Sequence, residues 1–135
     1  MNASLTFLSI APEVALAAAV ILLLMVEVGF KPRPGVWGAI AGAGLAAATA
    51  LSAWQWVAHR GADAGVFWHE MIAVDGFSAF AGMLVFPLAG LGLMSAWRLA
   101  ASQRRRGAEF VALVLLAATG AHLMAAAGDL IMLFI

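Results

Sequence analysis

Four long apolar segments dominate this chain and constrain what it can fold into. They share a length near twenty residues and a composition rich in Ala, Leu and Val, and they cover residues 12–30, 36–58, 77–97 and 109–127. A bilayer hydrocarbon core about 30 Å thick requires roughly 20 mainly apolar residues in helical form. A fifth segment begins near Asp129 and reaches only Ile135, so we predict the start of a fifth span and a chain that continues beyond it.

The composition supports a membrane protein rather than a water-soluble one. Of the 135 residues, 65% are hydrophobic and 10% are charged, whereas soluble domains carry about 25% charged residues. In lipid the backbone must satisfy its own hydrogen bonds, so only helices and closed barrels span the bilayer. The unbroken apolar runs lack the alternation of barrel strands. We therefore predict an all-α transmembrane bundle forming one membrane domain over residues 1–135.

The basic residues predict the orientation of the bundle. Lys31 and Arg33 follow the first segment, and Arg98 and the run 104–106 follow the third, so these two loops carry six of the seven basic residues. The positive-inside rule places both loops in the cytoplasm and the N-terminus outside. The apolar spans predict a lipid bilayer as partner. The basic run has no interleaved aromatic residues, so we predict no nucleic acid as partner.

Three ionisable residues near or inside the spans are candidates for a proton path, because such residues in membrane segments are commonly functional. They are Glu27, Glu109 and His122. Each has a structural alternative: Glu27 can pair with Lys31 one turn later, Glu109 can interact with the helix dipole, and His122 can be a neutral residue bonded to a neighbouring helix. These alternatives remain open on the sequence alone.

The remaining polar signals predict structure rather than chemistry. Asp75 and Asp129 stand beside glycines at the start of segments, where a carboxylate can cap free backbone amides. The chain has no cysteine, and its three histidines do not share metal-ligand spacing. We predict no catalytic, cofactor or metal site in this chain, and no independent transport, because no span contains a central charged residue.

The second segment also carries a stripe of small residues at four-residue spacing, which allows helices to approach closely in lipid. The stripe consists of Gly38, Gly42, Ala46 and Ala50. We predict that it serves packing between the helices of this chain. Pro87 lies midway along the third segment and predicts a kink there.

Four short motifs occur in an order that resembles a known family. They are A-P-E at 11–13, V-D-G-F-S at 74–78, G-A-E-F at 107–110 and D-L-I-M-L-F at 129–134. In this order they resemble the N-terminal part of subunit N of NADH:quinone oxidoreductase, or respiratory complex I. Subunit N belongs with the antiporter-like membrane subunits, which include the Mrp-type cation/proton antiporters.

The resemblance implies a proton-translocating subunit in the membrane arm, within a multi-pass protein of a bacterial inner membrane. It implies other membrane-arm subunits as partners, and FMN, iron–sulfur clusters and quinone bound by other subunits. From the resemblance we carry over two residues only, Glu109 at the family's E-F position and Asp75 at its D-G-F position, as expected capping or water-contacting residues. The family's buried glutamate of the fifth helix would fall past Ile135, and His122 stands where the family has an apolar residue.

Two alternatives stay open at this point. The shared motifs also allow an Mrp-type antiporter subunit, which the sequence beyond Ile135 or the neighbouring genes would distinguish. A short structural or assembly membrane protein is the second alternative, and a complete short reading frame would favour it.

Overall fold

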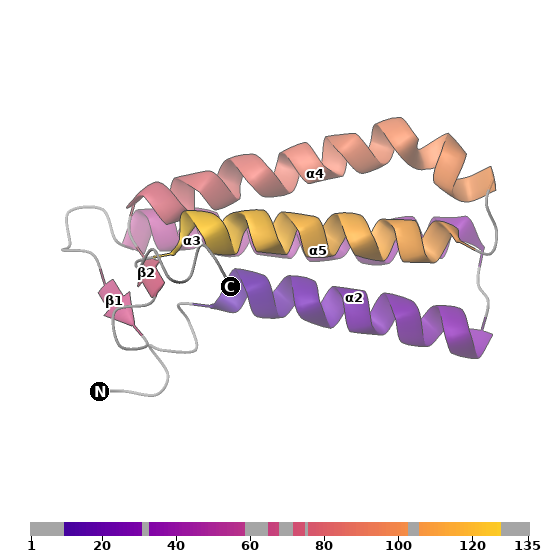
Figure 1. Ribbon diagram of the computed structural model, residues 1–135, viewed down its shortest axis with the longest axis horizontal. Coiled ribbons are helices and arrows are strands. Elements are labelled where there is room, and N and C mark those ends of the chain that lie inside the picture. Colours follow the sequence, from indigo (N-terminus) through magenta and orange to yellow (C-terminus); the bar gives the residue numbers. More distant parts are fainter. Residues whose placement is uncertain are drawn as a thin grey trace.

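The described part of the chain is a bundle of long helices. The computed structural model describes residues 10–30, 33–58, 65–67, 72–74, 76–102 and 106–127. Its helices are α2 (Ala11–Phe30), α3 (Pro34–Ala58), α4 (Gly76–Ser102) and α5 (Gly107–Ala125), labelled in Figure 1. Within the described residues these 4 helices are each long and apolar enough to cross a membrane. The predicted fold class, a transmembrane helix bundle with four complete spans, is therefore confirmed.

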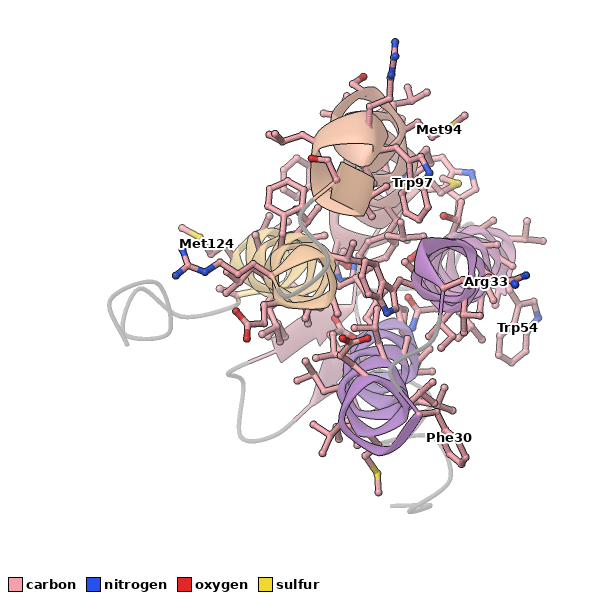
Figure 2. The ribbon with its side chains drawn as sticks, turned by 90° about the vertical axis from the view of Figure 1, so that its right-hand side faces the viewer. Phe30, Arg33, Trp54, Met94, Trp97 and Met124 are labelled. Atoms are coloured by element: carbon pink, nitrogen blue, oxygen red, sulfur yellow. The ribbon has the colours of Figure 1, made fainter. Side chains whose placement is uncertain are left out.

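The described helices pack in a closed ring, and helices that follow one another in the sequence run antiparallel. Figure 2 views the bundle end-on, with α2 and α4 on opposite sides and α3 and α5 at the other two corners. Contacts join α2 to α3, α3 to α4, α4 to α5, and α5 back to α2. The ring therefore places α2 against α5, the two helices that are farthest apart in the sequence.

The antiparallel order gives the bundle two distinct ends, which we name here. The hairpin end holds the first residues of α2 and α4 and the last residues of α3 and α5, on the left of Figure 1. The arginine end holds the opposite helix ends, with the exposed residues Arg33, Arg98 and Arg106. The loop charges predict that the arginine end faces the cytoplasm, and this orientation stays a prediction.

Apolar side chains fill the interior and also cover the outside. Leu16, Leu23, Phe86 and Leu115 are fully buried at the centre of the bundle. Equally apolar residues, such as Val28, are exposed on the outer faces. Helices that are apolar all round suit a lipid environment, whereas a helix at a water surface carries a polar face.

A short β-hairpin lies in the loop between α3 and α4, which the all-helical prediction did not anticipate. Strand β1 (Gly65–Phe67) pairs antiparallel with β2 (Ile72–Val74), with Val66 opposite Ala73. β-branched and aromatic residues favour extended backbone, and Val66, Phe67, Ile72 and Val74 supply them. Strand β2 contacts α4, so the hairpin adjoins one end of the bundle.

The helix ends differ slightly from the predicted segments. Helix α4 continues past Trp97 to Ser102, because residues of high helix propensity follow the tryptophan and the membrane boundary does not end a helix. Pro34 is the first residue of α3, a position where a missing amide donor costs nothing. The predicted caps Asp75 and Asp129, and the fifth segment 129–135, lie outside the described residues.

Candidate functional site

A buried acid–base pair joins the first and last described helices at the hairpin end. Glu13 lies in the first turn of α2, and His122 lies in the last turn of α5. The Nδ1 atom of His122 is 2.7 Å from Oε1 of Glu13, and the two side chains are 3% and 11% exposed. Such burial is rare for charged groups unless they are paired, so the two residues act as a unit.

The partner of the second ring nitrogen of His122 indicates which atoms of this pair carry hydrogen. Its Nε2 atom lies 3.1 Å from the backbone carbonyl oxygen of Ser78 in α4. A carbonyl oxygen only accepts hydrogen bonds, so Nε2 carries a hydrogen and donates it. The contact between Nδ1 and Oε1 then contains one shared proton. That proton belongs either to a neutral Glu13 facing a neutral imidazole or to an imidazolium facing a carboxylate.

Close helix packing encloses the pair, and it depends on Gly82 in α4. A Cβ atom added at Gly82 would lie 2.8 Å from Nε2 of His122 and would also collide with Oγ of Ser52. The ring of Phe86 packs against the imidazole with centroids 4.9 Å apart. Oε2 of Glu13 and Oγ of Ser52 are buried without a hydrogen-bond partner among the described residues.

A second carboxylate of α2 binds an indole toward the arginine end. Oε2 of Glu27 accepts a hydrogen bond of 2.7 Å from Nε1 of Trp37 in α3. Trp37 is only 1% exposed, so it is a core residue of the bundle. A Cβ added at Gly107 of α5 would lie 2.6 Å from the Trp37 ring. The alternative partner of Glu27, Lys31, lies outside the described residues.

The structure places the three predicted proton-path residues in different surroundings. His122 is buried in the pair with Glu13, and Glu27 is half-buried against Trp37. Glu109 is exposed in the first turn of α5, at the arginine end. The structure does not bring Glu109 and His122 together, since they occupy opposite ends of α5, and their part in a proton path stays a prediction.

The residue that sequence reasoning missed is Glu13. A carboxylate directly after Pro12 in a first helical turn has an ordinary explanation in the helix dipole, so its position alone does not predict a site. Its partner His122 is 109 residues away. The available signal was an acidic and a basic group, one in the first and one in the last complete span.

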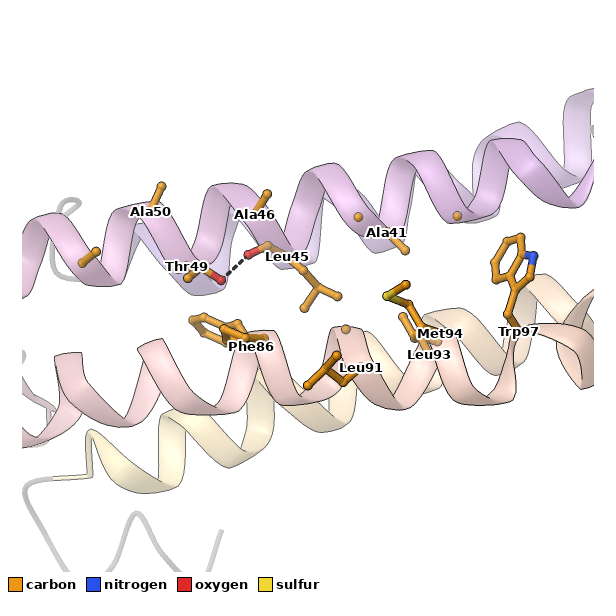
Figure 3. Close-up of a pocket in the computed structure, with 15 residues that line it drawn as sticks. Ala41, Leu45, Ala46, Thr49, Ala50, Phe86, Leu91, Leu93, Met94 and Trp97 are labelled. Carbon is orange, nitrogen blue, oxygen red and sulfur yellow. Dashed lines mark hydrogen bonds between the residues drawn. The ribbon is translucent and has the colours of Figure 1, made fainter.

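An apolar groove lies between α3 and α4, on the side of the bundle opposite the contact between α2 and α5, and Figure 3 shows it. Its volume is about 900 Å³. Thr49 lines the groove, but its hydroxyl donates to the backbone carbonyl of Leu45. The predicted small-residue stripe divides here: a Cβ at Gly38 would meet the Trp97 ring at 2.7 Å, whereas one at Gly42 would meet nothing within 4 Å. Only part of the stripe is used for packing within the described bundle.

The fold and the buried pair define a polytopic helical membrane protein with ionisable groups between its helices. Comparisons with curated proteins then identify its relatives. The chain is 37% identical over 131 residues to NADH-quinone oxidoreductase subunit N of Geobacillus kaustophilus, covering 93% of this chain and 25% of the relative. It is 30% identical over 137 residues to NAD(P)H-quinone oxidoreductase subunit 2 of Prochlorococcus marinus, covering 100% and 25%.

A third relative, NADH-quinone oxidoreductase subunit N 1 of Solibacter usitatus, is 39% identical over 72 residues, or 53% of this chain and 15% of the relative. The chain thus spans a quarter or less of the length of these curated relatives. No family model matches the chain, and no solved structure matches it. The chain is a homologue of NADH-quinone oxidoreductase subunit N, as the order of its motifs indicated.

Proposed function

We propose that this chain is part of a proton-translocating membrane subunit of an NADH:quinone oxidoreductase, the respiratory complex I. The observation that carries the proposal is the similarity to subunit N and subunit 2 over 93% and 100% of the chain. The helices long enough to span a membrane fit such a subunit. In this role the complete subunit moves protons across the membrane, driven by electron transfer from NADH to quinone in other subunits.

The proposal gives the polar residues of this chain an auxiliary part. Glu27, Glu109 and His122 are the candidates for contact with a proton path. Glu109 is exposed in the first turn of α5, where a carboxylate can receive protons from water at the side predicted as cytoplasmic. His122 is buried at the other end of the same helix. A path through this chain would therefore need groups between them that the complete subunit supplies.

The same proposal covers partners, cofactors and location. The partners are other membrane-arm subunits of the complex, and the membrane is the inner membrane of a bacterium. FMN, iron–sulfur clusters and quinone are assigned to other subunits. The residues of this chain do not fit an iron–sulfur cluster, because thiolates are the usual cluster ligands and the chain has no cysteine.

The test is to delete the gene in its native host and to tag the encoded protein for purification from membranes. We expect deletion membranes to lose proton-coupled NADH:quinone oxidoreductase activity and to regain it with the restored gene. We also expect the tagged protein to co-purify with that activity. Unchanged activity in deletion membranes, together with purification free of complex I subunits, would contradict the proposal. Sodium-dependent proton exchange in place of NADH oxidation would favour the Mrp-type alternative.

A further inference from the structure

The buried pair at the hairpin end has a property that ordinary helix-fastening contacts lack. Because Nε2 of His122 is committed to the carbonyl oxygen of Ser78, the one proton between Nδ1 and Glu13 can occupy either atom. Its transfer from the Oε1–H bond to Nδ1 converts a neutral acid and a neutral imidazole into a carboxylate and an imidazolium. The net charge of the pair is zero before and after, so the transfer places no net charge in the low-dielectric interior.

We propose that Glu13 and His122 form a proton-exchange site at the hairpin end, in which the Glu13 carboxyl gives its proton to a bound water and receives one from it in return, so that the pair stays neutral. The Glu13 side chain is 11% exposed and that of His122 is 3% exposed, so Glu13 is the less enclosed member of the pair, although its Oε2 atom is itself buried. The existence of this site does not depend on the proposed function. Its role in transport, which is proton transfer between the bundle and the outer side of the membrane, rests on the proposed function.

Two polar atoms at the pair are free to bond to water, which would allow proton exchange within the close packing around Gly82. Oε2 of Glu13 and Oγ of Ser52 are buried without hydrogen-bond partners among the described residues. Buried polar atoms of this kind are usually satisfied by internal water. Oε2 is part of the pair, and Oγ of Ser52 and Nε2 of His122 both lie close to Gly82. Water bound there would give the Glu13 carboxyl a partner with which to exchange its proton.

No other described charged group competes for this proton. The remaining described ionisable residues lie toward the arginine end of their helices, and they are Glu27, Arg33, Arg98, Arg106 and Glu109. On the elements that pack around His122, the pair is faced by Glu13 from α2, Ser52 from α3 and Ser78 from α4. Within the part of the chain that the structure describes, the proton balance of the site therefore depends on the pair itself.

The direct test is nitrogen-15 NMR of labelled histidine in the full chain in lipid nanodiscs, with His59→Gln and His69→Gln so that only His122 reports. We expect a hydrogen on Nε2 and a shared proton on Nδ1 that exchanges with deuterated water faster than the backbone amide of Leu115. Glu13→Gln should abolish the shared proton while its amide still donates to Nδ1. An Nε2 without hydrogen, or exchange as slow as that of Leu115, would overturn the proposal.

The matched control is Glu109→Gln, which changes an exposed carboxylate at the opposite end of α5 and should leave the His122 spectrum unchanged. A second arm measures protons translocated per NADH oxidised in the intact complex. We expect Glu13→Gln to lower this ratio; an unchanged ratio would refute the use of the site in transport while leaving the proposed function standing. If the wild-type protein purifies without NADH:quinone activity, the proposed function fails, and the spectrum still decides whether the proton site exists.

Discussion

Helix α2 carries two carboxylates about four turns apart on one face, and they make two different kinds of bond. Glu13 lies 2.7 Å from a ring nitrogen of His122, and Glu27 lies 2.7 Å from the ring nitrogen of Trp37. The distances are equal, but the partners differ in chemistry. An indole nitrogen only donates its hydrogen, whereas an imidazole nitrogen can donate or accept.

The difference shows that geometry alone does not make a functional site in a membrane bundle. The bond between Glu27 and Trp37 links α2 to α3, and its hydrogen stays on the indole nitrogen. In the contact between Glu13 and His122, the hydrogen can lie on either atom. Burial strengthens the contrast, because Glu13 is buried while Glu27 is half-buried. The comparison therefore separates a hydrogen-bonded fastener from a pair that can hold and pass a proton.

The largest effect should come from breaking the buried pair on one side only. His122→Leu leaves the Glu13 carboxyl buried without its partner, and removal of one member of a buried pair costs about 3–5 kcal/mol. We expect a loss of about 3 kcal/mol in the free energy of unfolding. Reversible denaturation in mixed micelles measures it.

The matched double variant Glu13→Leu/His122→Leu distinguishes a structural loss from a general packing defect. Replacing both members of a buried pair by apolar residues is often neutral or stabilising, so most of the stability should return. If the double variant is as unstable as His122→Leu, the loss comes from packing around α5, and the contrast between the two carboxylates does not hold.

The next effect tests how tightly the helices enclose the pair. Gly82→Ala introduces a methyl group 2.8 Å from Nε2 of His122, and overpacking of this kind costs about 1–3 kcal/mol. Gly92→Ala is the matched control on the same helix, because a Cβ there meets nothing within 4 Å; it should leave stability unchanged or raise it. Equal effects of the two changes would mean that α4 does not approach the pair closely.

A smaller effect is expected at the other carboxylate. Glu27→Ala leaves the Nε1–H of Trp37 without its acceptor, and the net value of such a hydrogen bond is about 1 kcal/mol. Glu27→Gln keeps a carbonyl oxygen as acceptor and should change the free energy of unfolding by less than about 0.5 kcal/mol. Indole fluorescence cannot isolate one of five tryptophans, so unfolding should be followed by far-UV circular dichroism. A large loss in Glu27→Gln would indicate that the negative charge itself is required.

The sequence predicted the spans well and the contacts between them poorly, for a physical reason. Apolar length alone indicates each span, and Pro34 and Gly76 stand where α3 and α4 begin. Because these helices are apolar on all faces, no periodicity indicates which face meets which neighbour. His122 was recognisable as a candidate, but its pairing with Glu13 depends on α2 packing against α5, which only the tertiary structure shows.

The smallest effect should come from Glu109, and it completes the comparison among the acidic side chains. Glu109 is exposed in the first turn of α5. Its interaction with the helix dipole is screened by water and headgroups, so Glu109→Gln should change the free energy of unfolding by less than about 0.5 kcal/mol. The measurement is the same denaturation series used for Glu27. A loss as large as that of His122→Leu would show that Glu109 contacts a partner at the arginine end. The stability contributed by an acidic residue would then not follow from its described partner alone.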